Sequence, residues 1–193
     1  MSDGNRARGV SKAQWLEKGL QALSEGGVSA LTIEGLAKSL GIARAGFYWH
    51  FKNRDDLLRQ LLGYWTNELT AVITENPELD AMPPKARLLN AMEMVHDHEM
   101  GRYDLAIRQW ALQDEEAARA VKTANRMRLD FFRKALSELG FAGDDLEMRA
   151  MLFAGYHSLE RAMFPEIPRK RRRELIARRV ELLTGSDRDE QNT

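Results

Sequence analysis

Apolar side chains recur along this chain at the spacing of α-helices. Leu16, Leu20 and Leu23 follow the i, i+4, i+7 pattern, which predicts a helix over about residues 11–25 that ends at Gly26. No alternation of apolar and polar residues is long enough to indicate a strand. Further helices are predicted over residues 33–40, 43–51 and 58–72 and, after a proline-rich break, over residues 84–99, 103–113, 115–139, 145–164 and 169–183. The sequence therefore predicts an all-α protein of about nine helices.

The second and third predicted helices are separated by only Gly41 and Ile42, which is typical of a helix-turn-helix. Thr32 is the expected N-cap of the second helix. Phe47 and Phe51 lie about 40° apart around an α-helical axis, so both should point into the core. The opposite face of the third helix then carries a mixture of polar, small and aromatic residues: Arg44, Ala45, Tyr48, Trp49 and Lys52.

This outward face suits a groove of DNA. An arginine such as Arg44 can read a guanine edge, an alanine can touch a thymine methyl group, and tyrosine and lysine can contact phosphates. His50 lies at the flank of this face, where we expect a phosphate contact. The alternative is a solvent-exposed amphipathic helix that binds nothing. The adjacent pair Tyr48 and Trp49 beside Arg44 favours DNA, because exposed aromatic groups are uncommon on a purely solvated face.

The stretch Leu31–Leu58 resembles the TetR family of tetracycline-repressor-like regulators. The resemblance covers this stretch and the helix before it, whereas the rest of the chain matches only in the number and length of its helices. It is carried by Thr32, Leu36, Ala37, Gly41, Ile42, Tyr48, His50, Phe51 and Leu57, with Lys52 and Arg54 at basic positions.

The resemblance implies a helix-turn-helix DNA-binding domain over residues 1–55 and a ligand-binding and dimerisation domain over 56–185, followed by a polar tail over 186–193. It also implies a homodimer that is released from a palindromic double-stranded DNA operator by a small molecule. Such a protein is a transcriptional regulator, expected to be a repressor and not an enzyme. The residues implied to contact phosphates or bases are Thr32, Arg44, Ala45, Gly46, Tyr48, His50 and Lys52. Two positions depart from the family pattern, because Ala43 and Gly46 stand where hydroxyl residues are common.

Small residues recur every four positions on the eighth predicted helix, which permits close packing between helices. Because the last two helices form the dimer interface in the family, we expect a self-contact there, with packing inside one chain as the alternative. The small residues are Ala150, Ala154, Ser158 and Ala162, and the expected partner stripe is Ile176, Val180 and Leu183.

The middle of the chain is rich in methionine and aromatic residues, which adapt to apolar or aromatic ligands. The resemblance places an effector pocket here, so we expect a small apolar or aromatic effector. Ordinary core packing is the alternative. The candidate lining residues are Trp65, Leu69, Met92, His96, Met100, Tyr103, Trp110, Met127, Phe131 and Tyr156.

Composition narrows the possible functions. The chain has no cysteine, which excludes disulfides and thiolate chemistry, and no apolar run long enough for a membrane span. Without a signal peptide, a cytoplasmic location is expected, and no cofactor is expected. The net charge of zero hides a basic start, with a charge of +3 over residues 1–63, an acidic middle, with −6 over 64–168, and a basic end, with +3 over 169–193.

Two other classes of protein remain open. His96 and Asp97 are similar to the His-Asp dyad of helical metal-dependent phosphohydrolases, but His96 and His98 point about 200° apart on a helix and so cannot share an ion. A DNA-architectural protein without an effector would bind DNA with little sequence preference. The basic run Arg169–Arg179 is expected to be a solvated helix face.

Overall fold

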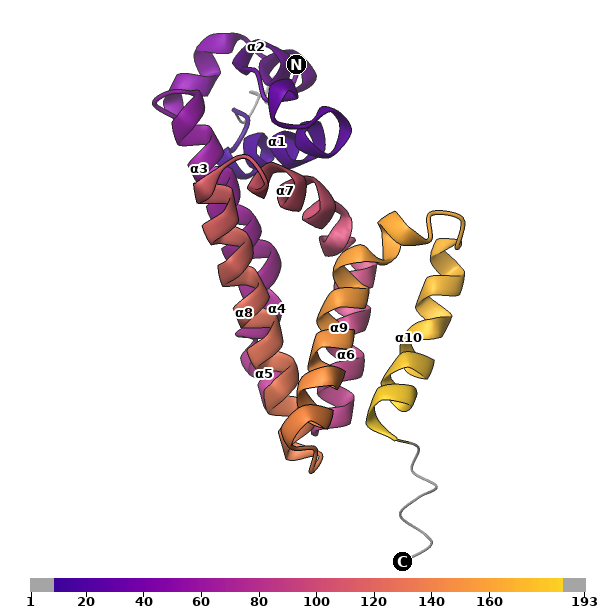
Figure 1. The fold of residues 1–193 in the computed structure, drawn as a ribbon. Helices are drawn as coiled ribbons and strands as arrows, with labels where there is room; N and C mark the ends of the chain where they lie inside the picture. The colour runs from indigo at the N-terminus through magenta and orange to yellow at the C-terminus, as the bar shows by residue number, and fades with distance from the viewer. Residues whose placement is uncertain (1–8, 186–193) are drawn as a thin grey trace, which may run out of the picture.

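The computed structural model describes residues 9–185, which fold into helices without a strand (Figure 1). The predicted all-α class is confirmed. The described residues form ten α-helices and four short helical turns. The α-helices are α1 (Lys12–Gly26), α2 (Ile33–Ser39), α3 (Arg54–Thr66), α4 (Val72–Thr74), α5 (Pro77–Asp80), α6 (Pro84–Asp97), α7 (Asp104–Ala111), α8 (Glu115–Glu138), α9 (Gly143–Met163) and α10 (Arg169–Thr184). The turns are the 3₁₀ segments η1 (Val28–Ala30), η2 (Arg44–Trp49) and η4 (Met100–Tyr103), and the π-helical segment η3 (Asn67–Ala71).

Local hydrogen bonds explain where the N-terminal helices begin and end. Ser11 and Gln14 form a capping box at α1, in which each side chain accepts a bond from the other residue's backbone amide. The hydroxyl of Thr32 accepts a bond from the amide of Gly35 at 3.1 Å, which confirms the predicted N-cap of α2. Gly41 has a φ of +69°, a conformation that costs glycine little, so it can turn the chain sharply after α2.

A first core holds the helix-turn-helix together and continues into the middle of the chain. Its buried members come from α1, α2, η2 and α3, and also from η4, α7 and the start of α8. The aromatic members are Trp15, Phe47, Phe51, Trp65, Tyr103 and Trp110. The N-terminal helices therefore share one core with the segment that follows α6.

The helix predicted over residues 58–72 changes phase at η3. Its apolar spacing predicts one buried stripe of Leu58, Leu61, Leu62, Trp65, Leu69 and Val72. The π-type turn adds a residue to one helical turn, which rotates every later side chain. Thr70 is consequently buried and its hydroxyl donates to the carbonyl of Trp65 at 3.3 Å. Val72, expected on the buried stripe, is exposed, and Ile73 is buried in its place.

A second core lies at the far end of the molecule from the helix-turn-helix. It is built by α4, α5, α6, the end of α8, α9 and α10, and α10 packs along α6 (Figure 1). Phe132 of α8 and Phe153 of α9 stack with ring centroids 5.2 Å apart. No helix within residues 9–185 is long and apolar enough to cross a membrane. The predicted polar tail over 186–193 lies outside the described residues.

The predicted dimer stripe on α9 faces the inside of the same chain. Ala150 is fully buried, and the hydroxyl of Ser158 accepts bonds from Arg108 and Arg128. The partner residues Ile176 and Val180 are likewise buried in the second core. Ala150, Ser158, Ile176 and Val180 therefore pack inside their own chain, while a self-contact through the rest of the stripe stays a prediction. Ala154 and Leu183 are partly buried against this core, and Ala162 is exposed.

Candidate nucleic-acid interface and ligand cavities

The segment after the turn is held in place by its aromatic residues. Phe47 and Phe51 are buried, as predicted, with ring centroids 5.0 Å apart. Trp15 of α1 meets Phe47 edge-on at 5.5 Å. The segment is a 3₁₀ turn and not the expected α-helix, and Ala43 at its start offers no side-chain cap. Aromatic packing therefore positions η2 in the absence of a cap.

The opposite side of η2 is open to solvent. Tyr48 is 52% exposed and Trp49 is 86% exposed, and Ala45 and Lys52 are exposed as well. This arrangement gives one outward face of polar and aromatic groups beside the exposed N-terminus of α2, where Thr32 lies.

Arg44 is held on this face by two neighbours. Its Nη1 lies 2.7 Å from Oε1 of Glu34 on α2, and its Nη2 donates to the hydroxyl of Tyr48 at 3.1 Å. The hydrogen bond to Tyr48, followed by the charge of Glu34, raises the pKa of Arg44. An exposed ion pair of this kind contributes little to stability, so a stronger acceptor can displace Glu34. Sequence reasoning missed Glu34, which looked like an ordinary surface acid.

His50 and Gly46 have structural partners on this element. Nε2 of His50 hydrogen-bonds to the carbonyl of Val10 at 2.8 Å. Because a carbonyl oxygen can only accept, Nε2 is the donor in this bond and is already engaged within the protein. A Cβ at Gly46 would lie 3.2 Å from Cδ1 of Ile42, which is a tight contact, so close packing accounts for the glycine.

The N-terminal geometry has counterparts among known proteins. A family model described as bacterial regulatory proteins, tetR family, matches residues 16–61. Residues 16–61 are therefore similar to the N-terminal segment of TetR-family regulators. It is 37% identical over 46 residues to the HTH-type transcriptional regulator AcrR of Shigella flexneri, covering 24% of this chain and 21% of AcrR. It is 32% identical over 82 residues to the probable HTH-type regulator ArpR of Pseudomonas putida, covering 41% of this chain and 39% of ArpR. The alignments thus span well under half the length of these curated relatives.

Solved structures match the fold over a larger part of the chain. A transcriptional regulator from Rhodococcus sp. Rha1 superposes with a TM-score of 0.67 and 17% identity, covering 90% of this chain and 96% of that one. The regulator FadR of Bacillus subtilis, solved in complex with stearoyl-CoA, gives 0.67 and 18%, covering 91% and 98%. At this level of identity the likeness establishes the shared fold over about nine tenths of the chain.

The residues expected to line an effector pocket divide into two groups. Met92 and His96 line a cavity of about 450 Å³ between α6, α9 and α10, and Met92 also lines a smaller neighbouring cavity of about 30 Å³. Leu69, Met100 and Phe131 line the smaller cavity as well. The residues that line neither cavity are Trp65, Tyr103, Trp110, Met127 and Tyr156.

Three of the expected pocket residues belong to the core shared with the helix-turn-helix. Trp65, Tyr103 and Trp110 are all buried there, and Trp65 donates from Nε1 to Oδ1 of Asp104 at 3.1 Å. Large apolar side chains of this kind are typical both of ligand pockets and of cores, and in the structure these three lie in the core. Met127 faces a different, open surface groove. Tyr156 lies under Arg179, whose Cζ is 4.2 Å from the centre of its ring.

The larger cavity contains charged residues that sequence reasoning missed. Arg172 and Arg179 line it from α10, facing Glu160 of α9. They belong to the basic run that we expected to be a solvated face. The signal was their spacing, because Arg172, Ile176 and Arg179 follow i, i+4, i+7 and so share the buried face of α10.

Proposed function

We propose that the chain is a homodimeric, sequence-specific DNA-binding transcriptional repressor. Its affinity for the operator falls when a small organic effector occupies the C-terminal helical domain. The observation that carries this proposal is the outward face of η2, where Arg44, Tyr48 and Trp49 are exposed while Phe47 and Phe51 anchor the segment from behind. A rigidly held face with an arginine and aromatic groups suits a DNA groove.

Arg44 is the residue we assign to base readout. In the free protein Glu34 and Tyr48 already hold its guanidinium group at the surface. Binding to the O6 and N7 atoms of a guanine would replace an exposed ion pair with a bidentate hydrogen bond. Lys52, which is exposed beside the start of α3, is assigned to a phosphate.

The dimer contact is assigned to the outer face of α9 in place of the buried stripe. Met148, Met151, Leu152 and Met163 are exposed there, and Leu182 is exposed on α10. A row of exposed apolar side chains on one helix marks an interaction site. A second copy of the chain fits this face because a helix-turn-helix dimer reads two half-sites of a palindrome.

The effector step is supported by the cavities between the C-terminal helices. The fold neighbour FadR of Bacillus subtilis was solved with stearoyl-CoA bound, so this fold can hold an organic ligand. The cavity of about 450 Å³ in the present chain lies within the usual range of ligand pockets, roughly 300–1,000 Å³.

Sequencing the genomic DNA fragments that the purified protein selects tests the proposal, followed by footprinting of the selected site. We expect one short palindrome to be protected. Arg44→Ala should weaken binding by about 1–3 kcal/mol at each half-site and relax preference at one base pair. Equal affinity for all fragments would favour a DNA-architectural protein instead. The control Lys18→Ala changes a charge on α1, which lies outside the proposed face, and should leave binding unchanged.

The dimer face is tested separately by sedimentation. Leu152→Glu should give monomers, because it places a charge in the apolar contact. The control Leu112→Glu changes another exposed leucine, at the end of α7, and should leave the dimer intact. A dimeric Leu152→Glu variant would place the contact elsewhere.

A further inference from the structure

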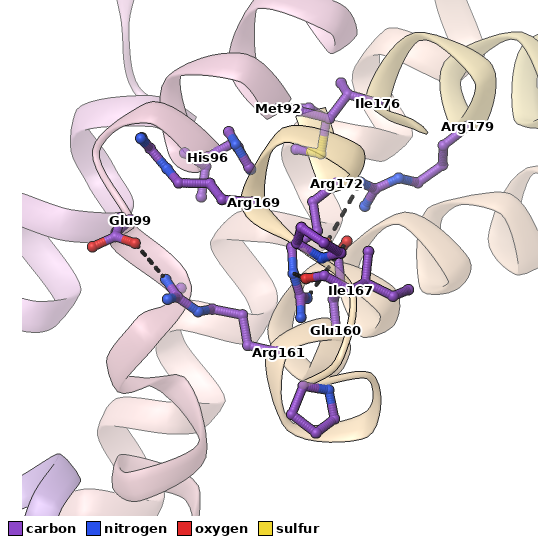
Figure 2. Close-up of a pocket in the computed structure, with 14 residues that line it drawn as sticks. Met92, His96, Glu99, Glu160, Arg161, Ile167, Arg169, Arg172, Ile176 and Arg179 are labelled. Atoms are coloured by element: carbon purple, nitrogen blue, oxygen red, sulfur yellow. Dashed lines mark hydrogen bonds and ion pairs between the residues drawn. The ribbon is translucent and has the colours of Figure 1, made fainter. Parts of the chain in front are cut away.

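The cavity between α6, α9 and α10 has an apolar wall and a cationic wall (Figure 2). Met92, Val95 and Ile176 form apolar parts of its lining. The charged lining residues are arginines and glutamates in a ratio of two to one: Arg161, Arg169, Arg172 and Arg179 against Glu99 and Glu160. The cavity therefore carries an excess of positive charge beside an apolar surface.

Arg172 is fixed in this cavity with one donor unused. It is 8% exposed, and its Nε donates to the carbonyl of Ile167 at 2.9 Å while Nη2 donates to the carbonyl of Phe164. Nη1 is buried without a hydrogen bond, since the nearest acid, Glu160, lies 3.8 Å away. A buried donor left in this state is costly, because it has lost its water without gaining a partner.

Arg179 presents a second unused donor to the same acid. Its guanidinium lies over the ring of Tyr156, its Nη2 is 3.7 Å from Oε2 of Glu160, and its Nη1 is buried without a hydrogen bond. Burial lowers the pKa of Arg179, although arginine remains charged in proteins. One carboxylate thus faces two buried guanidinium groups at distances longer than a hydrogen bond, which leaves one positive charge uncompensated.

The surrounding polar groups do not neutralise this charge. At the cavity wall Arg161 is paired with Glu99 at 3.1 Å, and Arg169 donates to the carbonyl of Asp97 at 3.0 Å. His96 faces the cavity from α6, and burial, followed by the charge of Arg169, lowers its pKa, which keeps the ring neutral at pH 7.

We propose that this cavity binds an organic anion, a carboxylate or a phosphate monoester, whose charged group meets Nη1 of Arg172 and of Arg179. The apolar part of the anion lies against Met92, Val95 and Ile176. We assign the effector to this chemical class, and this assignment alone rests on the proposed function. The binding itself is independent of DNA.

The apolar part can extend beyond this cavity. The smaller cavity shares Met92, Val95 and Gly101 with the larger one and is otherwise mainly apolar, with Leu69 and Phe131 in its wall. Methionine side chains adapt their shape easily, so Met92 can move to let a longer chain pass. Affinity should therefore rise with the length of the apolar chain.

The test is calorimetric titration of the full chain without DNA. The probes are sodium octanoate, octyl phosphate, 1-octanol, sodium acetate and inorganic phosphate. We expect one or both of the eight-carbon anions to bind at least about tenfold more tightly than octanol, as one charge-assisted hydrogen bond predicts, and more tightly than the anions without a chain. The preference between octanoate and octyl phosphate identifies the charged group. Equal binding of octanol and the anions, or no binding of either anion, overturns the proposal.

Variants on α10 locate the site. Arg179→Gln should weaken binding of the preferred anion by at least about tenfold and leave octanol unchanged, because it removes one charged donor. Arg178→Gln is the matched control, since Arg178 is the exposed neighbour paired with Glu181 at 3.2 Å. Arg172 is a poor choice because it also holds the end of α9. Identical affinities of the Arg179→Gln and Arg178→Gln proteins, with unchanged melting temperatures, would refute the site.

An operator-binding assay distinguishes anion binding in the cavity from the role of that anion as effector. An anion that binds through Arg179 and does not release DNA leaves the site standing and removes its role as effector. A protein that selects no DNA refutes the proposed function, whereas the calorimetric result on the anion still stands.

Discussion

Asp104 is a position at which a single substitution should have a large effect on stability. It is fully buried, accepts a hydrogen bond from Trp65 and is ion-paired with Arg128, whose Nη2 donates to it at 3.1 Å. Arg128 is itself only 12% exposed and also donates to Thr70 and Ser158. Asp104→Ala would leave the charge of Arg128 buried with neutral partners only. Breaking a buried pair in this way costs about 3–5 kcal/mol, against a total stability of about 5–15 kcal/mol.

Urea denaturation followed by far-UV circular dichroism measures this loss as a lower midpoint with an unchanged slope. Asp104→Asn keeps an acceptor for Trp65 and should cost less than alanine. The double variant Asp104→Ala with Arg128→Met removes both charges, so it should be more stable than Asp104→Ala alone, with a coupling of roughly 0.5–3 kcal/mol. Asp130→Ala is the control, because this exposed acid of α8 should matter by less than about 1 kcal/mol. If Asp104→Ala and Asp130→Ala shift the midpoint equally, the buried pair does not stabilise the fold.

Three further predictions concern the DNA-binding face and the cavity. Phe47→Ala should cost about 3–5 kcal/mol in a urea titration, whereas Tyr48→Ala should change stability by less than about 0.5 kcal/mol; similar losses would mean that η2 is not anchored by Phe47. Lys52→Ala should weaken binding to all DNA sequences alike and reduce the slope of log affinity against log salt by about 1, measured by footprinting at two salt concentrations, and an unchanged slope would rule out a phosphate contact. Burial lowers the pKa of His96 below 6.5, so the unfolded chain binds more protons just below that pH and His96 makes stability fall as the solution is acidified. Between pH 7 and about pH 5 the urea midpoint of the His96→Gln protein should therefore fall less than that of the unchanged protein. If the two midpoints fall equally with pH, the pKa of His96 is not lowered by folding.

The helices and the anchoring of η2 could be predicted because they depend on local patterns. Apolar spacing defined the helical segments, and the four-residue separation of Phe47 and Phe51 put both rings in the core. The same reasoning assumed a regular helix after Leu58 and therefore placed Val72 on the buried side. A π-type turn leaves no clear signal in composition or spacing, so the change of phase at Thr70 could not be anticipated.

The buried charged residues could not be predicted from the sequence for a different reason. Asp104, Arg128, Arg172 and Glu160 resemble ordinary surface residues in the sequence, and charged residues are rarely buried without a partner. Their partners come from other helices, as with Arg172 and the carbonyl of Phe164, so only the folded structure reveals them. The small-residue stripe was ambiguous in a similar way, because close packing inside one chain and between two chains requires the same residues.

One short segment connects the cavity to the helix-turn-helix. Glu99, which pairs with Arg161 at the cavity, has a φ of +51°, a left-handed conformation that is strained for a residue other than glycine. The next turn, η4, carries Arg102, whose Nη2 lies 3.5 Å from Oε1 of Glu17 on α1. Tyr103 then enters the core shared with the N-terminal helices. These contacts join the edge of the cavity to α1, on which Trp15 packs against the anchoring ring of Phe47.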